Sequence, residues 1–234
     1  MVHGMEGAGY ARHAFNDQIK VLEHDLLEMG SRAEQMVGEA VESLWRLDSE
    51  LARSVLAKDD DIDARDLSIE SRCLEMLALQ QPMAGDLRVV GTAMKMITDI
   101  ERIGDLAVDI AKITMKIEKE FGESSFIDIP GMANIARSML CEVLEAYVRR
   151  DLVRVDDVCK RDEEVDELYR QLRGQIFEHM RAYPDQVVSH SWLLLAIHHV
   201  ERIADHTVNI AERVRFMVTG QLRPNAQFIR TNQS

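Results

Sequence analysis

An internal repeat is the feature of this 234-residue chain that most constrains its fold. Residues 101–111 read ERIGDLAVDIA and residues 201–211 read ERIADHTVNIA, with seven identities in eleven positions at an offset of 100 residues. Upstream, residues 58–63 (KDDDID) align with residues 161–166 (RDEEVD) at an offset of 103. A repeat that keeps its order along the chain predicts two structural units of the same kind in tandem.

Apolar residues recur at helical spacing through most of the chain. Two examples with steps of three or four residues are the series Leu44, Leu47, Leu51, Val55 and the series Ile135, Met139, Val143, Tyr147. This periodicity gives each helix one apolar face, and no alternating strand pattern is sustained. Because only 4 prolines and 12 glycines interrupt it, we predict an all-α fold of two tandem pseudo-symmetric three-helix bundles.

Turn-forming residues divide the chain. We expect loops at Gln81-Pro82 and at Tyr183-Pro184-Asp185, and a longer linker where glycine, serine and proline cluster between the two units. The predicted organisation is a first three-helix repeat at residues 10–118, a linker at 119–131, a second three-helix repeat at 132–217 and a polar C-terminal tail at 218–234.

Charge and composition exclude several classes of protein. The net charge of −13 argues against binding nucleic acid, because neutralising phosphates requires clustered Lys and Arg. The longest apolar run, residues 192–197, is far shorter than the roughly 20 residues that span a bilayer. The chain begins without a signal-peptide pattern, and its cysteines form no Cys-x-x-Cys pair. We therefore expect a cytoplasmic protein without a membrane span.

Each repeated motif carries a row of acidic residues on one side of its helix. At about 100° per residue, Glu101, Asp105 and Asp109 lie within about 80° of one another, opposite the main apolar stripe. The matching row of the second unit consists of Glu201, Asp205 and Asn209. Like charges four residues apart cost roughly 0.2–0.5 kcal/mol per pair, so the repeated row indicates that a cation offsets the repulsion.

A second acidic step precedes each row, on the helix before it. It consists of Asp59 and Asp63 in the first unit and of Asp162 and Asp166 in the second. If adjacent helices are antiparallel, the two rows of a unit face each other and offer several carboxylate oxygens to one or more cations. Such donors suit Mg²⁺, Ca²⁺, Mn²⁺ or iron better than zinc.

Basic residues near the rows give an alternative explanation. An interhelical ion-pair network with Arg102 and Arg202 would also hold the carboxylates. Lys112 offers a partner within the first helix, but Glu212 stands at the matching position of the second. An ion pair within the helix therefore cannot explain both rows. No pattern of Ser, Cys and His indicates a catalytic centre, so we do not expect an enzyme.

Taken in order, these residues resemble the PhoU family, the accessory regulators of bacterial phosphate-specific transport, over residues 12–222. The motifs that carry the resemblance are residues 81–88 (QPMAGDLR), 100–105 (IERIGD), 200–210 (VERIADHTVNI) and 218–221 (VTGQ). The resemblance implies the duplicated three-helix architecture. It also implies a divalent metal or a multinuclear metal cluster (Fe, Mn, Mg or Zn) on the acidic rows.

The resemblance assigns ligands residue by residue. The implied metal ligands are Glu101, Asp105 and Asp109 in the first unit, Glu201, Asp205 and Asn209 in the second, and Asp63 and Asp166 as supporting residues. Because Asn209 is not a carboxylate, we expect it to hold a cation less strongly or through its carbonyl oxygen.

The resemblance also implies a function. It is that of a negative regulator of phosphate uptake and phosphate-starvation signalling, a cytoplasmic adaptor that links the ATPase of a phosphate ABC transporter to a membrane sensor histidine kinase. A homodimer is expected as well. Two alternatives stay open, namely a metal-dependent hydrolase acting on phosphate esters and a purely structural helical repeat protein.

Overall fold

The computed structural model describes the backbone of residues 3–120 and 127–221 and the side chains of residues 13–119 and 127–221. The helices in these ranges are α1 (His3–Arg46), α2 (Ser49–Leu56), α3 (Asp59–Gln80), α4 (Gly85–Glu120), α5 (Ile129–Arg149), α6 (Leu152–Ala182), a short 3₁₀ turn η1 (Pro184–Gln186) and α7 (Val187–Thr219). The described residues contain no strand, which confirms the predicted all-α class.

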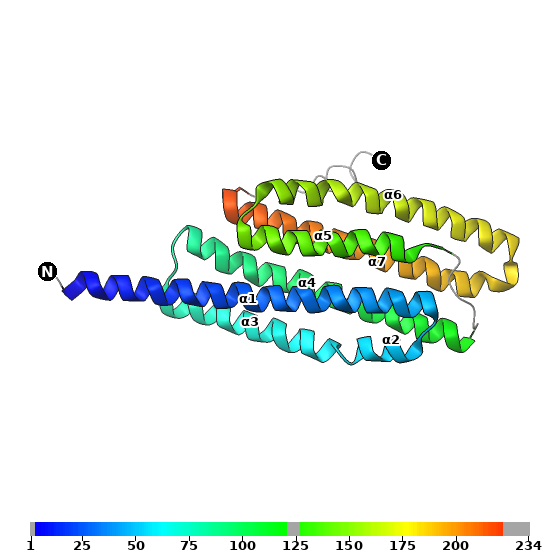
Figure 1. The fold of residues 1–234 in the computed structure, drawn as a ribbon, viewed down its shortest axis with the longest axis horizontal. Helices are drawn as coiled ribbons and strands as arrows, with labels where there is room; N and C mark the ends of the chain where they lie inside the picture. Colours follow the sequence, from blue (N-terminus) through cyan, green and yellow to red (C-terminus); the bar gives the residue numbers. More distant parts are fainter. Residues whose placement is uncertain (1–2, 121–126, 222–234) are drawn as a thin grey trace.

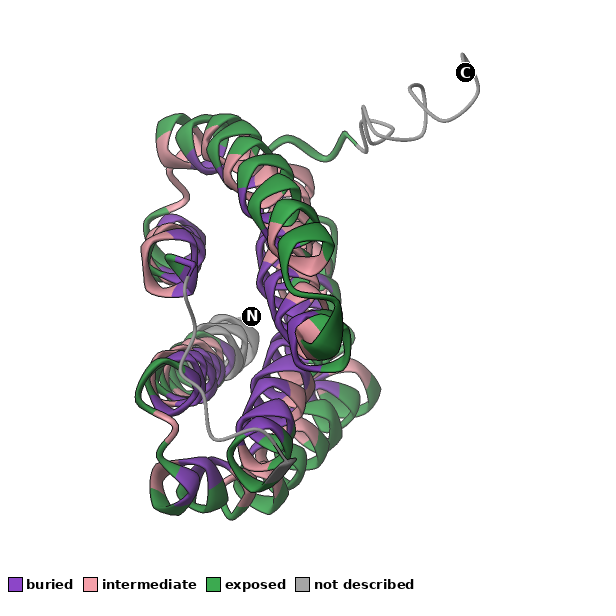
Figure 2. Ribbon diagram, turned by 90° about the vertical axis from the view of Figure 1, so that its right-hand side faces the viewer, coloured by how far each residue is buried: buried purple, intermediate pink, exposed green. Residues whose placement is uncertain are grey.

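The helices form two units that pack side by side. Figure 1 shows α1 to α4 in one half of the molecule and α5 to α7 in the other, with the α3–α4 turn and the α6–α7 turn at opposite ends. The halves meet where α4 packs along α7 and α1 packs along α5. Buried residues line these inner faces, while α3 and α6 lie toward the two outer edges (Figure 2). The arrangement confirms two tandem pseudo-symmetric bundles.

The turn after the first helix is built in the same way in both units. Leu47 and Arg150 adopt left-handed backbone with φ of 54° and 57°. The next residues, Asp48 and Asp151, cap the following helix through their side chains, which accept bonds from the amides two and three residues later. The helical spacing from Leu44 to Val55 therefore does not mark one continuous helix. It continues across the turn because α1 and α2 bury their apolar faces in the same core.

The second long helix is continuous in the second unit, as α6, but is broken into α2 and α3 in the first. Ala57 and Lys58 keep right-handed backbone, with φ of −71° and −92°, so the break is a kink and not a loop. The kink was not predicted, because helical periodicity continues through it. Residues 59–61 are three aspartates in the first turn of α3. Aspartate is more favourable in the first turn of a helix than in its interior. The aligned residues 162–164 of α6 include two glutamates, which tolerate a helix interior better.

Two glycines on α1 allow α5 to approach closely. A Cβ atom on Gly30 would lie 2.5 Å from Cδ1 of Leu144, and one on Gly38 would lie 2.7 Å from Cζ of Arg137. The guanidinium of Arg137 pairs with Glu34 at 2.7 Å. Since residues 34 and 137 are related by the 103-residue offset, this ion pair joins equivalent positions of α1 and α5.

The predicted loops at the two prolines are present. Gln81 ends α3 with φ of 44°, and Tyr183 ends α6 before η1. Of the predicted linker 119–131, residues 119 and 120 belong to α4 and residues 129–131 to α5, whereas residues 121–126 lie outside the described residues. The predicted tail lies outside them from residue 222 onward. No helix in the described part of the chain combines the length and hydropathy needed to cross a membrane.

Candidate metal centres

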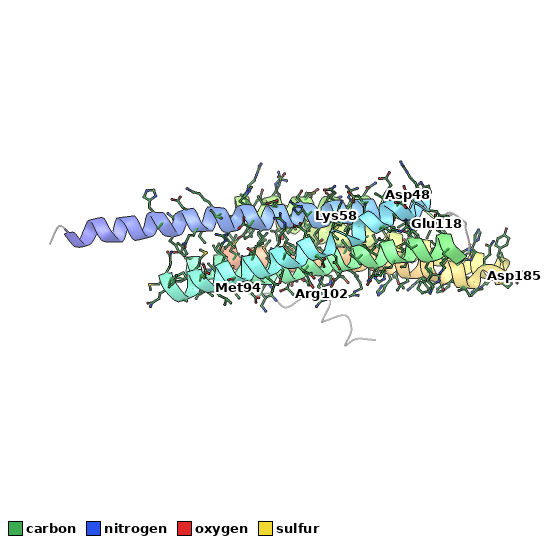
Figure 3. The ribbon with its side chains drawn as sticks, turned by 90° about the horizontal axis from the view of Figure 1, so that it is seen from below. Asp48, Lys58, Met94, Arg102, Glu118 and Asp185 are labelled. Atoms are coloured by element: carbon green, nitrogen blue, oxygen red, sulfur yellow. The ribbon has the colours of Figure 1, made fainter. Side chains whose placement is uncertain are left out.

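Antiparallel packing of α3 on α4 brings the acidic rows of the first unit together. We call the first acidic cluster the set Asp59, Asp63, Asp66, Glu101, Asp105 and Asp109. The side chains of the two helices are close enough to interact. The charges of Asp63 and Asp66 on α3 raise the pKa of Glu101 on α4. Figure 3 looks onto α2, α3 and α4, with Lys58 and Arg102 labelled near the middle of the molecule's length.

The second unit repeats this arrangement between α6 and α7. We call the second acidic cluster the set Asp162, Asp166, Glu201 and Asp205. The charges of Asp162 and Asp166 on α6 raise the pKa of Glu201 on α7. The expectation that the two rows of each unit face each other is therefore met in both halves.

Behind the acidic rows, the helix packing of the two units differs by two substitutions that compensate each other in size. A Cβ atom on Gly104 would lie 3.4 Å from Cγ2 of Ile62, an ordinary contact, so alanine fits this position. The second unit has Ala204 at the matching place, and Val165, one methyl group smaller, at the position of Ile62. The prediction that Ala204 lets its helix continue agrees with the unbroken α7.

The carboxylates of the first cluster are only moderately perturbed. Burial raises the pKa of Asp59, with further increases from the charges of Asp63 and Asp105. Burial is also the main reason that the pKa of Glu101 is raised, followed by the charge of Asp105. These shifts show that the carboxylates lie in partly desolvated surroundings and repel one another.

The carboxylates of the second cluster are perturbed more strongly. Burial, with the charges of Asp166 and Asp205, raises the pKa of Asp162 to about 7. Burial, with the charge of Asp205 first among its neighbours, raises the pKa of Glu201 to about 7. At neutral pH Asp162 and Glu201 are therefore only partly ionised in the metal-free protein.

Each cluster contains a carboxylate oxygen that is buried without a hydrogen-bond partner in the described part of the protein. These atoms are Oδ1 of Asp66 and Oε2 of Glu201. The ring Nδ1 of His198 lies 3.2 Å from Oε2 of Glu201, but the two groups are not aligned as a hydrogen bond. A buried acceptor left without a partner is costly, and a bound cation would satisfy it. In donor chemistry, both clusters suit a hard cation.

Arg102 and Lys112 pair with the first row within α4. One Nη atom of Arg102 lies 2.7 Å from Oδ2 of Asp105, and its Nε lies 3.4 Å from Oε2 of Glu101. Lys112 Nζ lies 3.0 Å from Oδ1 of Asp109. The ion pairs of Arg102 are thus with its own helix, whereas the alternative network required pairs between helices.

The side chain of Asn209 has a hydrogen-bond partner on α4. Its side-chain amide donates to Oδ1 of Asp99 on α4 at 3.3 Å, and Nδ1 of His206 lies 2.9 Å from the same oxygen. The side chain therefore lies at the α4–α7 interface, at the edge of the second cluster. Across the same interface, the charge of Asp109 raises the pKa of His199, although burial lowers that pKa overall.

Two participants were missed by the sequence analysis. Asp66 continues the spacing of Asp59 and Asp63 by one helical turn, so the same periodicity argument identifies it. Asp99 gave no such signal, because the repeat places His199 at its position. Its role depends on how α4 packs against α7.

All the predicted ligands except Asn209 belong to the two clusters, but they form no preformed coordination shell. Among the described side chains, no three His, Cys, Asp or Glu groups converge closely enough to hold a metal ion as they stand. Their side chains would have to move to bring three or more oxygens around one ion.

The fold and these clusters define a class, namely duplicated helical-bundle proteins with one carboxylate cluster in each repeat. Comparison with known families is specific. The PhoU domain model matches residues 26–114 and again residues 129–214, once in each unit. The chain belongs to the PhoU family.

Individual relatives and solved structures agree with this family assignment. The chain is 36% identical over 211 residues to a protein of Clostridium acetobutylicum named phosphate-specific transport system accessory protein PhoU homolog, covering 90% of this chain and 96% of that one. The crystal structure of PhoU from Pseudomonas aeruginosa is similar with a TM-score of 0.84 and 31% identity, over 88% of this chain and all of that one. PhoU from Streptococcus pneumoniae, described as a phosphate transport system regulatory protein, gives 0.83 and 29%, covering 90% and 99%.

These names are those of accessory and regulatory proteins and not of enzymes. They agree with the expectation that the chain has no catalytic activity of its own.

Proposed function

We propose that this protein is a negative regulator of phosphate uptake and of phosphate-starvation signalling. The observation that carries the proposal is the match of both repeats to one family, with relatives named as accessory proteins of phosphate-specific transport. A regulator of this kind acts by binding other proteins, which agrees with a fold in which neither unit shows a catalytic constellation among its described residues.

The proposed partners are the ATPase of the phosphate ABC transporter and the membrane sensor histidine kinase. The protein would link the two from the cytoplasmic side when phosphate is plentiful, and it would do so as a homodimer. Its net charge of −13 and its half-exposed acidic clusters favour basic partner surfaces, because complementary charge speeds association and selects partners.

The proposal includes a divalent metal or a multinuclear cluster of Fe, Mn, Mg or Zn in each unit. The residues that would hold it are Asp63, Glu101, Asp105 and Asp109 in the first, and Asp166, Glu201, Asp205 and the carbonyl oxygen of Asn209 in the second. The buried oxygens of Asp66 and Glu201 that lack a hydrogen-bond partner support this assignment. A bound cation would reverse the local charge and give an acidic surface affinity for anions.

The regulatory role is tested in cells. In a deletion strain grown at high phosphate, we expect expression of a phosphate-starvation reporter to rise, and the wild-type gene to restore repression. Unchanged expression in the deletion strain would contradict the role.

Metal binding and the enzymatic alternative are tested on pure protein. Protein purified without chelator or metal-affinity resin should contain metal by element analysis, and Asp105→Asn and Asp205→Asn should each reduce the content. Hydrolysis of phosphate esters that disappears in both variants would favour the enzyme instead.

A further inference from the structure

A cavity of about 380 Å³ lies between the end of α1 and the beginning of α5, two helices that pack along each other where the units meet (Figure 1). Its apolar walls are Val41 and Trp45 on α1 and Pro130 and Ala133 on α5. The acidic clusters lie on other helices, so the candidate metal centres do not use this cavity. Its volume is in the range that holds a small organic ligand.

Trp45 gives the cavity a flat aromatic surface. The residue is 44% exposed and forms part of the cavity wall. The face of an indole stacks well on other planar rings, including nucleobases. This wall therefore suits a planar ring better than a branched aliphatic group.

Arg137 places a guanidinium group at the same cavity. A Cβ atom on Gly38 would lie 2.7 Å from its Cζ, so the glycine makes room for the group beside α1. Its Nε donates to Oε1 of Glu34 at 2.7 Å, and one Nη donates to Oδ1 of Asn134 at 3.3 Å. A guanidinium carries five N–H groups, so these contacts hold it in place and leave donors for an anionic ligand.

The acidic side chains at the cavity are already engaged. Asp128 accepts the amide N–H of Gly131 at 2.9 Å and caps α5. Glu42 lies 3.0 Å from Arg46, with the two side chains 47% and 67% exposed. Because such an exposed ion pair contributes little to stability, Arg46 can turn toward an anion in the cavity.

The duplication gives an internal comparison for these residues. At the 103-residue offset, the pair of Glu42 and Arg46 corresponds to the pair of Glu145 and Arg149, whose charged groups are 4.0 Å apart. This ion pair is common to both units, so it does not by itself distinguish the cavity.

Two lining residues differ in kind from their equivalents. Val148 stands at the position of Trp45, and Glu34 stands at the position of Arg137. The cavity thus differs from the equivalent place in the second unit by an aromatic ring and by a change from an acidic to a basic side chain. Both differences favour a ligand that carries a planar ring and a negative charge.

We propose that the cavity binds a nucleoside monophosphate, with the base against Trp45 and the phosphate at Arg137 and Arg46. Such a molecule joins a planar ring to an anionic group, which guanidinium groups bind through paired hydrogen bonds. It contacts one helix of each unit and so strengthens the packing of α1 on α5. The site is separate from the candidate metal centres and adds a small-molecule effector to the proposed regulatory function.

The experiment uses the fluorescence of Trp45. The chain has two tryptophans, and Trp192 lies on α7 beneath Lys116, whose Nζ is 4.8 Å from its ring centroid. In full-length Trp192→Phe protein with chelator present, AMP should quench the remaining tryptophan in a saturable way. Adenosine and inorganic phosphate each lack half of the ligand, so each should bind at least about 10-fold more weakly than AMP.

Trp45→Leu tests the aromatic wall. Equilibrium dialysis against AMP replaces fluorescence for this variant, and the affinity should fall about 10-fold or more because the base loses its stacking partner. Val148→Ala is the matched control at the equivalent position of the second unit, and it should leave AMP binding unchanged.

The double variant Glu34→Gln, Arg137→Gln tests the guanidinium without leaving either charge unpaired. Its affinity for AMP should fall to about that of adenosine, whereas Arg149→Gln, at the position equivalent to Arg46, should have no effect. Circular dichroism checks that each variant keeps its helices. If the double variant does not fold, Arg46→Gln takes its place and should weaken AMP binding about 3-fold.

Three results would overturn the proposal. They are the absence of saturable quenching by AMP, unchanged AMP binding in Trp45→Leu, and equal affinity for AMP and inorganic phosphate. The metal content and the cellular reporter assay are measured separately, so failure here leaves both parts of the proposed function standing.

Discussion

The two acidic clusters occupy equivalent places in the two halves but are neutralised differently. In the first, Arg102 and Lys112 pair with the carboxylates of α4. In the second, two groups reach a pKa of about 7, and Glu212 occupies the position of the lysine. The duplication kept four of the six carboxylate positions and the arginine at 102 and 202, while the carboxylates at 66 and 109 and the lysine at 112 have no counterpart in the second unit.

The structural supports of the clusters diverged far less. Both units cap their second helix with aspartate, at Asp48 and Asp151. Both also tie that helix to the first by an ion pair, between Lys58 and Glu39 in one unit and between the aligned Arg161 and Glu142 in the other. Positions that hold helices together are thus constrained by packing, whereas a counter-ion near the surface is free to change.

The largest expected difference between the halves lies at the α4–α7 interface. Asp99→Ala removes the acceptor of Asn209 and the contact of His206, with both side chains of the Asp99–His206 pair less than 20% exposed. We expect the free energy of unfolding to fall by about 2 kcal/mol, because buried partners lose their hydrogen bonds. Urea unfolding at neutral pH with chelator present measures this.

Asp109→Ala is the comparison for that variant. Asp109 is 45% exposed and pairs with Lys112, so its loss should cost less than about 0.5 kcal/mol. A cost at Asp99 that is also below about 0.5 kcal/mol would show that the interface does not depend on Asp99.

A second difference is the pH dependence of stability. The folded-state pKa of Glu201 is about 7, above its ordinary value of 4.5. Between these values the folded protein binds more protons than the unfolded chain, so the free energy of unfolding falls as pH rises through this window. In metal-free protein at pH 8, Glu201→Gln should be more stable than wild type by about 1–2 kcal/mol, after allowance for partial exposure.

The matched variant in the other half is Glu101→Gln. Its gain at high pH should be smaller, since the pKa of Glu101 is raised less than that of Glu201. Urea unfolding across pH 5 to 8 gives both profiles. A larger gain for Glu101→Gln would reverse the comparison between the clusters.

The helix caps should behave alike. Asp48→Ala and Asp151→Ala each remove a side chain that accepts two backbone amides. Each should lower the free energy of unfolding by about 1 kcal/mol. Thermal unfolding of the alanine variants and of the matched asparagine variants, which keep the acceptor, checks this. A cost in only one half would show that the shared turn is not equally important in both.

The smallest expected effect concerns the ion pairs between the first and second helices of each unit. Arg161 bonds to Glu142 at 2.6 Å and to Ser138 at 3.1 Å, while Lys58 pairs with Glu39 and is more exposed. Arg161→Ala should cost about 0.5 kcal/mol and Lys58→Ala less. Paired urea titrations resolve this difference. A larger cost at Lys58 would show that its ion pair with Glu39 stabilises the kink between α2 and α3.

Much of the fold followed from local patterns. The repeat predicted two equivalent units, and the prolines predicted the loops after α3 and α6. The turns at Leu47 and Arg150 escaped prediction because neither position has the glycine that usually marks left-handed backbone, and no proline lies beside it. The kink at Ala57-Lys58 escaped as well, because helical periodicity continues through it.

The sequence by itself determined the all-α class, the duplication and the carboxylate rows, since helical spacing and repetition are properties of the chain. Only the tertiary structure decided which rows face each other, how deeply each carboxylate is buried, and that Asn209 bonds to Asp99. Those outcomes depend on the packing of α3 on α4, α6 on α7 and α4 on α7. Desolvation and distance between helices set the pKa values, and neither is encoded in the spacing along one helix.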